Sequence, residues 1–331
     1  MSIAISVVVP AYNEEPNIRP LYERLSQTLL KISPDYEILF VDDGSRDQTI
    51  SEIKKLRDMD PRVKYVSFSR NFGHEMANSA GFRNAQGDAV VIIDADLQDP
   101  PEVIGDMYAK YLEGYDIVFA KRLTRKKESF MKQFTSKAFY RVMRAMSDVE
   151  LPLDTGDFRL LSRRAVDELN TLGEHNRFFR GLTHWVGFNV TSVTFHREER
   201  FAGETKYNYI KLIKLAVDAI LSFSYKPLKF FSFLGALFAV GAFLMMIYWI
   251  GFKLITNLPV PGWTSLVTIL LLGFGILMMQ ISLIGEYVAR IYEEVRKRPL
   301  YIIGRSEGLN EVYGWDGGIK TVEDLEQRGR S

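Results

Sequence analysis

The chain has 331 residues, with 42 Lys and Arg against 41 Asp and Glu, and therefore a net charge of +1. This balance excludes a strongly basic nucleic-acid binder, and a hydrophobic content of 47% excludes a disordered chain. The sequence contains no cysteine, which excludes disulfides, thiolate metal sites and a cysteine nucleophile. At roughly 150 residues per domain, this length predicts about two domains.

The amino-terminal part of the chain alternates apolar runs with helical patterns. Strands are expected at residues 3–9, 37–41, 63–68, 88–93 and 115–120, with helices at 15–32, 47–59, 74–85 and from residue 99 onward. Apolar runs separated by helices are typical of a mainly parallel sheet that is covered on both faces. The sequence therefore predicts an α/β fold with a Rossmann-like sheet.

Polar motifs follow three of the expected strands, at the edge where parallel sheets bind their ligands. They are Tyr12 and Glu14 after the first strand, Asp42 and Asp43 after the second, and Asp94 and Asp96 after the fourth. Neither G-x-G-x-x-G after a strand nor G-x-x-x-x-G-K-[ST] occurs, which argues against a nicotinamide enzyme and a P-loop NTPase.

The pair Asp94 and Asp96 indicates metal chemistry. The two residues are two positions apart at a strand end, so an extended backbone directs both carboxylates to the same side. Such oxygen ligands suit Mg²⁺ or Mn²⁺ held together with a diphosphate. Taken alone, an Asp-x-Asp pair is also common in solvated loops, and the spacing leaves that interpretation open.

A basic segment follows the fifth expected strand. From Lys121 to Arg144 there are nine Lys and Arg and one acidic residue, Glu128, while apolar residues recur every four positions from Phe130 to Met146. This pattern predicts a basic amphipathic helix at the surface of an anionic membrane. An ordinary helix covering the domain is the alternative. A second amphipathic segment is expected at residues 207–223.

Two long runs without charge lie near the carboxyl terminus, at residues 230–252 and 259–285. Each exceeds the roughly 20 residues needed to cross a bilayer, which predicts transmembrane helices at about 230–252 and 264–286. Lys and Arg flank the outer ends of both runs, whereas the connecting loop contains only Lys253. The positive-inside rule therefore places both termini in the cytoplasm. Buried helices of a soluble domain are the alternative, but such helices rarely run this long without charge.

These features predict four segments. They are an α/β domain at 1–205, an amphipathic juxtamembrane segment at 206–229, the two transmembrane helices within 230–286, and a cytoplasmic carboxyl-terminal tail at 287–331. The first residues lack the basic start and the cleavage site of a signal peptide. We therefore expect a multi-pass protein of the cell inner (plasma) membrane whose α/β domain is cytoplasmic.

Four motifs are similar to those of the GT-A glycosyltransferases of family 2. They read VVVPAYNE at 7–14, VDDGSRDQT at 41–49, SRNFGH at 69–74 and DADLQDP at 94–100. Segments 154–162 and 200–207, the two apolar runs and the VPGW loop at 260–263 resemble, more narrowly, the polyprenol-phosphate glycosyltransferases. These include the dolichol-phosphate mannose synthases and the bactoprenol glucosyltransferases. The resemblance covers nearly the whole chain and implies a GT-A fold.

The resemblance also implies how the donor is bound. It places the base and ribose of a nucleotide-sugar near the first two motifs and a metal ion in the fourth. The implied donor residues are Pro10, Tyr12, Glu14, Asp42, Asp43 and Asp94, and the implied ligands of Mg²⁺ or Mn²⁺ are Asp94, Asp96 and Gln98. Carboxylates can accept hydrogen bonds from ribose hydroxyls and from a base N–H, which agrees with this assignment. Asp42 has a second interpretation, as a turn residue.

The implied acceptor is a polyprenyl phosphate. Four basic residues precede the two amphipathic segments and are assigned to phosphates, namely Arg122, Arg125, Arg200 and Lys206. Of these, Arg122 is expected to act in catalysis together with Asp96 and Asp157. Asp157 is either a general base, a ligand of a sugar hydroxyl or a residue that orients Arg159. A phosphate monoester is largely deprotonated at pH 7, so it hardly needs a base.

The expected function is inverting transfer of a hexose to the phosphate of undecaprenyl phosphate, with UDP-glucose as the favoured donor. GDP-mannose and UDP-aminoarabinose donors remain open, and a membrane-anchored scaffold is the non-enzymatic alternative. The four histidines share no metal-ligand spacing, so a structural role is expected for each. Glycines in both apolar runs favour helix packing, and the resemblance suggests a homodimer or homotetramer.

Overall fold

The computed structural model describes residues 3–123, 155–175, 177, 179–196, 226–256, 262–309, 311–315 and 319–320. The chain divides into two compact units. One, here called the sheet unit, comprises Met1–Tyr140, Val149–Tyr209 and Arg298–Ser331. The other, here called the helical unit, comprises Arg141–Asp148 and Ile210–Lys297.

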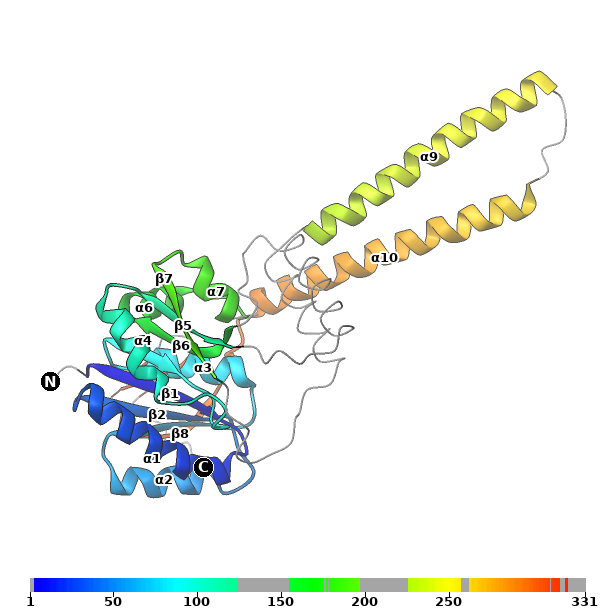
Figure 1. Cartoon of the computed structure of the whole chain (residues 1–331). Coiled ribbons are helices and arrows are strands. Elements are labelled where there is room, and N and C mark those ends of the chain that lie inside the picture. Colours follow the sequence, from blue (N-terminus) through cyan, green and yellow to red (C-terminus); the bar gives the residue numbers. More distant parts are fainter. Residues whose placement is uncertain are drawn as a thin grey trace. The chain divides into compact units, whose positions relative to one another are not determined.

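The sheet unit is built on an eight-stranded sheet (Figure 1). In spatial order its strands are β7 (Val190–Phe195), β5 (Ile117–Arg122), β6 (Thr155–Ser162), β4 (Ala89–Ile92), β1 (Ile5–Ala11), β2 (Tyr36–Asp42), β3 (Val63–Phe68) and β8 (Ile303–Glu307). Strands β1, β2, β3 and β4 pair in parallel, as do β5 and β7. A short ribbon joins β9 (Val312–Tyr313) to β10 (Ile319–Lys320). The predicted mainly parallel sheet is confirmed.

Helices cover both faces of this sheet. They are α1 (Glu15–Ile32), α2 (Thr49–Met59), α3 (His74–Asn84), α4 (Val103–Leu112), α6 (Arg163–Thr171) and α7 (Phe179–Trp185). Val7 and Val9 of β1 join a buried cluster with apolar residues of α1, α2 and α4. Val8 points to the opposite face, where it packs so closely on Gly81 of α3 that no Cβ fits there. The alternation along β1 therefore explains why helices pack on both sides.

Strand β6 runs antiparallel to both of its neighbours, β4 and β5. Its first residues therefore lie at the edge where the parallel strands end. Lys121 of β5 pairs with Thr155 of β6, so the chain between these strands leaves and re-enters the sheet at that same edge. This reversal brings Asp157, early in β6, next to the loops that follow β4 and β1.

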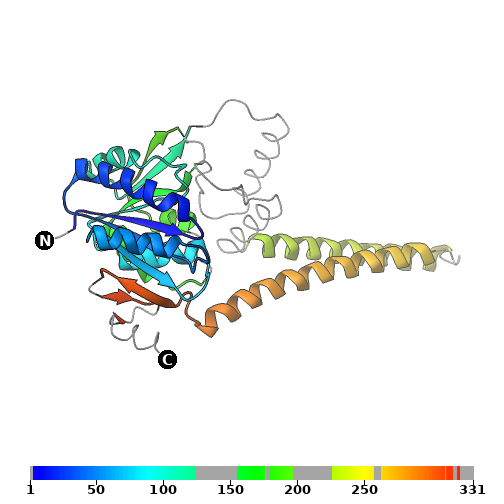
Figure 2. The same ribbon diagram turned by 90° about the horizontal axis from the view of Figure 1, so that it is seen from below.

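A strand that the sequence analysis did not expect lies within the predicted carboxyl-terminal tail. β8 pairs antiparallel with β3 and forms the edge of the sheet; Figure 2 shows it in orange-red. Its register joins Phe68 to Ile303 and Tyr65 to Glu307. Residues 298–331 belong to the sheet unit although they follow the last long helix of the chain.

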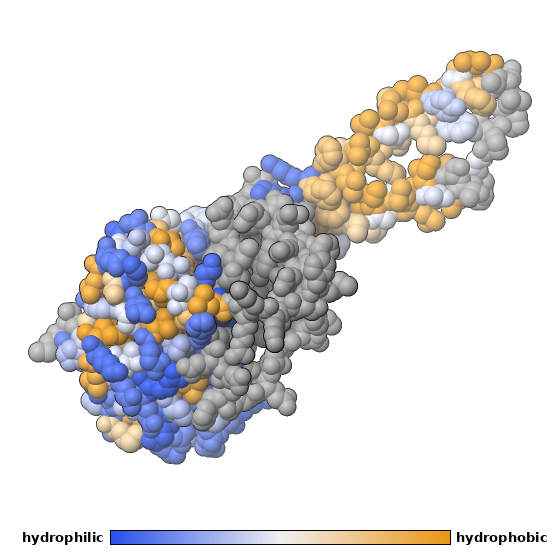
Figure 3. All heavy atoms as spheres, in the orientation of Figure 1, coloured by the Kyte–Doolittle hydropathy of each residue, from blue (hydrophilic) through white to orange (hydrophobic). Residues whose placement is uncertain are grey.

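The helical unit contains two long apolar helices, α9 (Lys226–Thr256) and α10 (Trp263–Arg296), which lie side by side in Figures 1 and 2. Both are long and apolar enough to cross a membrane. Large apolar side chains along them are exposed, and Figure 3 shows them in orange. Helix α10 extends ten residues beyond the predicted end at residue 286, where Glu286 and Arg290 form an i,i+4 ion pair of 3.2 Å.

Candidate active site

The Asp94–Gln98 loop follows β4 directly, as the sequence predicts. Asp94 comes two residues after the end of β4, and its side chain is 29% exposed. Leu97 has a φ of +59°, a conformation that costs free energy for a residue with a branched side chain, yet it is only 4% exposed. The backbone N–H of Gln98 donates to Oδ1 of Asp96 at 3.2 Å. The loop is therefore held in a strained, specific shape.

Three side chains converge beside this loop. Nε2 of His74, at the start of α3, lies 3.3 Å from Oδ2 of Asp157 and 3.6 Å from Oδ1 of Asp94. Among the histidines and acids of the described residues, these three form one group whose ligand atoms all lie within 4.8 Å of one another. They come from α3, the β4 loop and β6, which only the fold brings together. We call this group the acidic cluster.

The acidic cluster carries perturbed pKa values. Burial raises the pKa of Asp94 to about 6; the charge of His74 opposes that rise, and the neighbouring carboxylates of Asp157, Asp99 and Asp96 add to it. Burial alone would lower the pKa of His74, but the hydrogen bond with Asp157 and the charge of Asp94 raise it to about 9. His74 is therefore an imidazolium at neutral pH, held between two carboxylates.

Arg159 holds the carboxylate of Asp157 in position. Its guanidinium is 1% exposed and lies 3.2 Å from Oδ1 of Asp157. It also donates to the backbone carbonyls of Gly156 and Phe179 and to Oγ1 of Thr183, at 3.1, 3.2 and 2.9 Å. Because the buried cation has several partners on separate elements, it orients one carboxylate oxygen of Asp157 and leaves the other toward His74. Asp157 and Arg159 therefore hold each other in position. The expected role of Asp157 in orienting Arg159 is compatible with this contact and stays a prediction.

Asp42 is the last residue of β2 and Asp43 follows it, and the two carboxylates have different hydrogen-bond partners. Asp42 is 1% exposed, and its carboxylate accepts from the backbone N–H of Ser45 at 3.0 Å and from Oγ of Ser67 at 2.7 Å. These contacts favour the second interpretation of Asp42, as a turn residue. Asp43 is 3% exposed and accepts from the backbone N–H groups of Phe72 and Gly73.

Asp43 also holds the loop before α3 through a side chain. Nδ2 of Asn71 donates to its Oδ2 at 2.8 Å, in addition to the backbone bonds at 2.7 and 2.9 Å. Burial raises the pKa of Asp43, although the hydrogen bonds from Phe72 and Gly73 oppose the rise. The end of β2 and the start of α3 are therefore one hydrogen-bonded assembly.

The predicted donor residues after β1 lie at the same edge. Pro10 is buried within β1 opposite Val41, and Tyr12 is half-buried. The backbone N–H of Glu14 donates to Oγ1 of Thr49 at 2.9 Å, and its Oε2 accepts from Nδ2 of Asn17 at 2.6 Å. The loop after β1 is thus tied to the start of α2, beside Asp43.

Of the four predicted phosphate ligands, only Arg122 is among the described residues. It ends β5, and its Nη2 lies 3.2 Å from Oδ2 of Asp99, whose side chain is 1% exposed. A Cβ at Gly156 would come within 2.7 Å of the same Nη2, so this glycine leaves the room that the guanidinium occupies. Arg125, Arg200 and Lys206 lie outside the described residues.

Comparison with known proteins identifies the family. A model of "Glycosyl transferase family 2" matches residues 6–169. The uncharacterized glycosyltransferase YkcC of Bacillus subtilis is 49% identical, over 93% of this chain and 95% of its own length. The chain belongs to glycosyl transferase family 2. The SfII prophage-derived bactoprenol glucosyl transferase of Shigella flexneri is 42% identical, over 92% of this chain and 99% of its own.

A solved structure with a similar fold is the glucosyl-3-phosphoglycerate synthase from Mycobacterium tuberculosis, in complex with Mn²⁺, uridine-diphosphate and phosphoglyceric acid. It covers 66% of this glycosyltransferase and 76% of that chain, with a TM-score of 0.43 and 20% identity.

The donor atoms of this glycosyltransferase fit a divalent metal ion. Two carboxylates and the ring of His74 lie within 4.8 Å of one another, and a cation there would stabilise the ionised form of Asp94, whose pKa is raised chiefly by burial. Asp96 and Gln98, expected as ligands, lie outside this group of three. Because His74 is an imidazolium in the metal-free protein, it would have to lose its proton to become a ligand, whereas the carboxylate oxygens suit Mg²⁺ or Mn²⁺ directly.

His74 is the site residue that sequence reasoning missed. It stands 20 positions before Asp94 and 83 before Asp157, so no local spacing marks it as a ligand. The order of strands could have indicated it, because the segment 69–74 follows β3 at the same edge of the sheet as Asp43 and Asp94.

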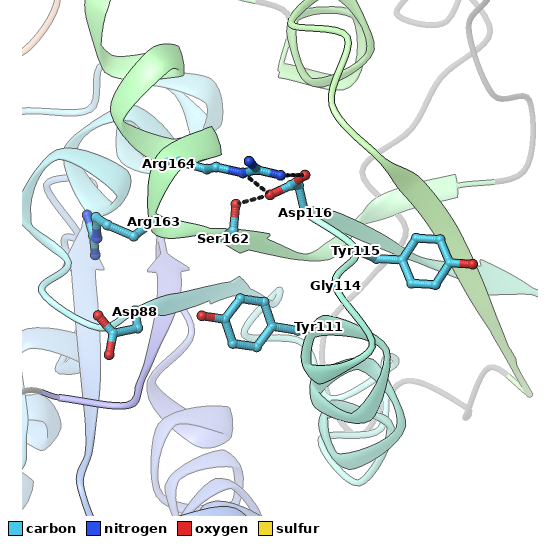
Figure 4. A pocket seen from close by; sticks show the side chains of 8 residues that line it. All are labelled: Asp88, Tyr111, Gly114, Tyr115, Asp116, Ser162, Arg163 and Arg164. Atoms are coloured by element: carbon cyan, nitrogen blue, oxygen red, sulfur yellow. Dashed lines mark hydrogen bonds and ion pairs between the residues drawn. The ribbon is translucent and has the colours of Figure 1, made fainter.

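A surface pocket of about 320 Å³ lies elsewhere in the described part of this glycosyltransferase. Its lining includes Asp88, Tyr111, Asp116 and Arg163, seen from close by in Figure 4. Asp88 precedes β4, so the pocket lies at the amino ends of the parallel strands, away from the acidic cluster. Bonds from Arg164 and Ser162 to Asp116 stabilise its wall.

Proposed function

We propose that this glycosyltransferase transfers a hexose, most specifically glucose from UDP-glucose, to the phosphate of a membrane polyprenol such as undecaprenyl phosphate. The observation that carries the proposal is the acidic cluster, formed by the start of α3, the loop after β4 and β6, in a chain that also has two helices long enough to cross a membrane. The identity of 42% with a bactoprenol glucosyl transferase over nearly the whole chain supports the same acceptor class.

The donor is assigned to the loops after β1 and β2. Tyr12 and Glu14 lie beside Asp43 at this edge, where a base and ribose can be contacted by a ring and by carboxylates. Pro10 lies within β1, one residue before its end. Asp42 supports the turn on which Asp43 sits, through its bonds to Ser45 and Ser67.

The donor diphosphate is assigned to the acidic cluster and the Asp94–Gln98 loop. Asp94 and Asp96, with His74 beside them, would hold Mg²⁺ or Mn²⁺, and Gln98 lies next in the loop. The ion, when bound, neutralises charge on the leaving diphosphate. His74 contributes a fixed positive charge at the same place, because its imidazolium is held by two carboxylates.

In the proposed step, an oxygen of the acceptor phosphate attacks the anomeric carbon of the sugar. The bond from that carbon to the nucleoside diphosphate breaks, the configuration inverts, and the nucleoside diphosphate leaves with the electron pair. No proton has to be removed from a phosphate that is already ionised at pH 7. Asp157 therefore acts by orientation: Arg159 and His74 hold it where a sugar hydroxyl can donate to it.

The acceptor phosphate is assigned to Arg122, Arg125, Arg200 and Lys206. Arg122 supports this assignment, because its guanidinium lies at the same edge of the sheet, half-buried between Asp99 and Gly156. The lipid tail would remain in the membrane beside α9 and α10, with both termini in the cytoplasm. Association of these helices into a homodimer or homotetramer belongs to the same proposal.

A direct test uses membranes that contain the protein and undecaprenyl phosphate. UDP-glucose, GDP-mannose, a UDP-aminoarabinose and UDP-N-acetylglucosamine, each labelled in the sugar, are added separately and the lipids are extracted. Label from UDP-glucose in the lipid phase, lost on chelation of divalent metal, is the expected result. Label from another donor would correct the sugar. Absence of lipid-linked label from all donors would favour the scaffold instead.

A further inference from the structure

The carboxyl-terminal segment from Arg298 to Trp315 is built into the sheet next to the loop that precedes His74. The backbone N–H of Ser69, the first residue after β3, donates to the carbonyl of Ile302 at 3.0 Å. Gly304 packs on the backbone of the same residue, with its Cβ position 3.4 Å from the Cα of Ser69. The start of the loop 69–73 is therefore anchored by residues that follow α10 in the sequence.

Tyr301 extends this anchor with an aromatic stack. The side chain is 1% exposed, and its ring lies 5.0 Å from that of Phe68 at an angle of 15°. The ring of Phe68 in turn meets that of Phe72 edge-on, at 5.7 Å and 87°. Phe72 is the residue whose backbone N–H donates to Asp43 at 2.7 Å. The rings of Tyr301, Phe68 and Phe72 thus connect the carboxyl-terminal segment to the loop 69–73.

A second contact joins the same segment to the far end of α3. The side chain of Asn84, 2% exposed, exchanges two hydrogen bonds with the backbone of Tyr313, at 2.8 and 3.2 Å. The hydroxyl of Tyr301 donates to the carbonyl of Tyr313 at 3.4 Å. The carboxyl-terminal segment therefore holds α3 at its last residue, while the aromatic stack holds the loop before its first residue, His74.

We propose that Tyr301 is a positioning residue of the active site: its ring, through Phe68 and Phe72, holds the loop 69–73 in the shape that places Asp43 and His74 for the nucleotide-sugar. The inference rests on the proposed function, since it names the donor as the ligand whose binding depends on Tyr301. It also assigns a role to the segment that follows α10.

The contacts indicate that Tyr301 acts on the conformation of the loop 69–73 rather than only on the stability of the fold. Phe72 and Gly73 each give a backbone N–H to Asp43, and the φ of Gly73 is +106°, which only a glycine adopts readily. The loop thus has one arrangement in which both bonds form. Removing the ring of Tyr301 takes away the flat surface against which Phe68 rests, so that the ring of Phe72 is held only by a less constrained Phe68 and by the guanidinium of Arg70, 3.9 Å from its centroid.

The test compares three variants of the full-length protein in detergent. Tyr301→Ala removes the ring, Tyr301→Phe keeps the ring and removes the hydroxyl, and Tyr36→Ala is the matched control. Tyr36 is also a buried tyrosine, 3% exposed, but lies at the amino end of β2 under Arg62. For each variant we measure KM and kcat for UDP-glucose, the melting temperature, and hydrogen–deuterium exchange of peptides covering residues 69–74.

Tyr301→Ala is expected to raise the KM for UDP-glucose by roughly tenfold, which corresponds to about 1.4 kcal/mol. It is also expected to speed exchange at residues 69–74. Tyr301→Phe should match the unmodified protein in both measurements. Tyr36→Ala should lower the melting temperature and leave both KM and exchange at residues 69–74 unchanged. Equal KM changes in Tyr301→Ala and Tyr36→Ala would overturn the inference, and so would unchanged exchange in Tyr301→Ala.

The exchange measurement separates failure of this inference from failure of the proposed function. Should the unmodified protein transfer no sugar from UDP-glucose, the proposed donor is wrong, yet exchange at residues 69–74 still reports whether Tyr301 holds the loop. Should transfer occur while Tyr301→Ala behaves like Tyr36→Ala in both measurements, only the positioning role is wrong.

Discussion

The two ends of the parallel strands treat their carboxylates in opposite ways. At the amino ends, two buried acids each face a cation: Glu37 lies 2.5 Å from Nζ of Lys64, and Asp116 accepts from Nε and Nη2 of Arg164. Hydrogen bonds from Arg164 lower the pKa of Asp116. Glu37 thereby ties β2 to β3, and the bond from Ser162 to Asp116 ties the start of β5 to the end of β6.

At the carboxyl ends the acids crowd one another instead. Asp94 and Asp157 share the imidazole of His74, and burial raises the pKa of both Asp94 and Asp43. Here the fold keeps negative charge that is costly to bury, at the edge where a metal ion and a diphosphate would meet. The comparison teaches that burial alone does not mark a functional acid, because the partners of a buried carboxylate decide whether its charge is compensated.

The largest effect is expected at the amino ends. Glu37→Ala should lower the free energy of unfolding by about 3–5 kcal/mol, because it breaks the ion pair with Lys64, whose ammonium keeps a bond to Oε1 of Gln86 at 3.1 Å, and removes a buried acceptor. Glu37 also accepts from Oγ of Ser6 at 2.5 Å and from the backbone of Gln86 at 2.7 Å. Chemical denaturation of the protein in detergent measures the loss. Glu113→Ala removes an exposed carboxylate and is the control; a similar loss there would contradict the comparison.

A loss of activity without a loss of stability is expected at the carboxyl ends. Asp96→Asn should slow sugar transfer roughly 10²–10³-fold, the cost of removing one preorganised group at a developing charge. The melting temperature should stay within a degree or so of the unmodified protein, because a crowded carboxylate is removed. The exposed Asp106→Asn is the matched control. Full transfer by Asp96→Asn without added metal would overturn the metal assignment.

The pH dependence of stability should have opposite signs at the two ends in metal-free protein. The pKa of Asp116 lies below its usual 3.8, so its stabilisation is present above that pH and is lost as the pH falls through the lowered value. The pKa of Asp94 is raised to about 6, so its ionisation removes stability as the pH rises from 3.8 through about 6.

Melting temperatures between about pH 3 and pH 7, measured in chelator, test this contrast. Asp116→Asn should flatten the curve at its acid limit, where the lowered pKa of Asp116 lies, and Asp94→Asn should flatten it in the window from pH 3.8 to about 6. If both variants changed the curve over the same pH range, the acids at the two ends of the strands would not differ in how they affect stability.

The smallest effect is expected where an ion pair is open to solvent. Arg24 of α1 binds Glu102 before α4 through two bonds of 3.0 and 2.7 Å, yet the side chain of Glu102 is 55% exposed. Arg24→Ala should therefore change the free energy of unfolding by less than about 1 kcal/mol. Denaturation at low and at high salt checks this, since the small effect should shrink further when salt screens it.

Much of the fold follows from local patterns. The apolar runs that became β1 to β4 lie deep between helices, so their composition alone predicted strands, and the loops after β1, β2 and β4 carried the predicted acids to one edge. Two long uncharged runs likewise predicted α9 and α10. The end of α10 was missed because helix continues past the apolar part through charged residues that pair along its surface, such as Glu286 and Arg290.

Other features depend on distant pairings that no local pattern contains. β8 has the sequence IGRSE, with neither alternation nor a run of branched residues, and it is a strand because β3 offers it an open edge. His74 becomes part of the acidic cluster only because β6 is reversed and brings Asp157 to it. The place of Asp157 could be expected from resemblance, but its contacts with His74 and Arg159 could not.

The reversed strand β6 has a consequence for how relatives of this chain can differ in length. Lys121 and Thr155 are paired neighbours, so β5 ends and β6 begins at one point on the edge of the sheet. Lengthening a connection whose two ends are already held together costs little, since each doubling of a loop adds only about 0.6 kcal/mol. We therefore expect insertions and deletions between β5 and β6 to leave the register of both strands unchanged.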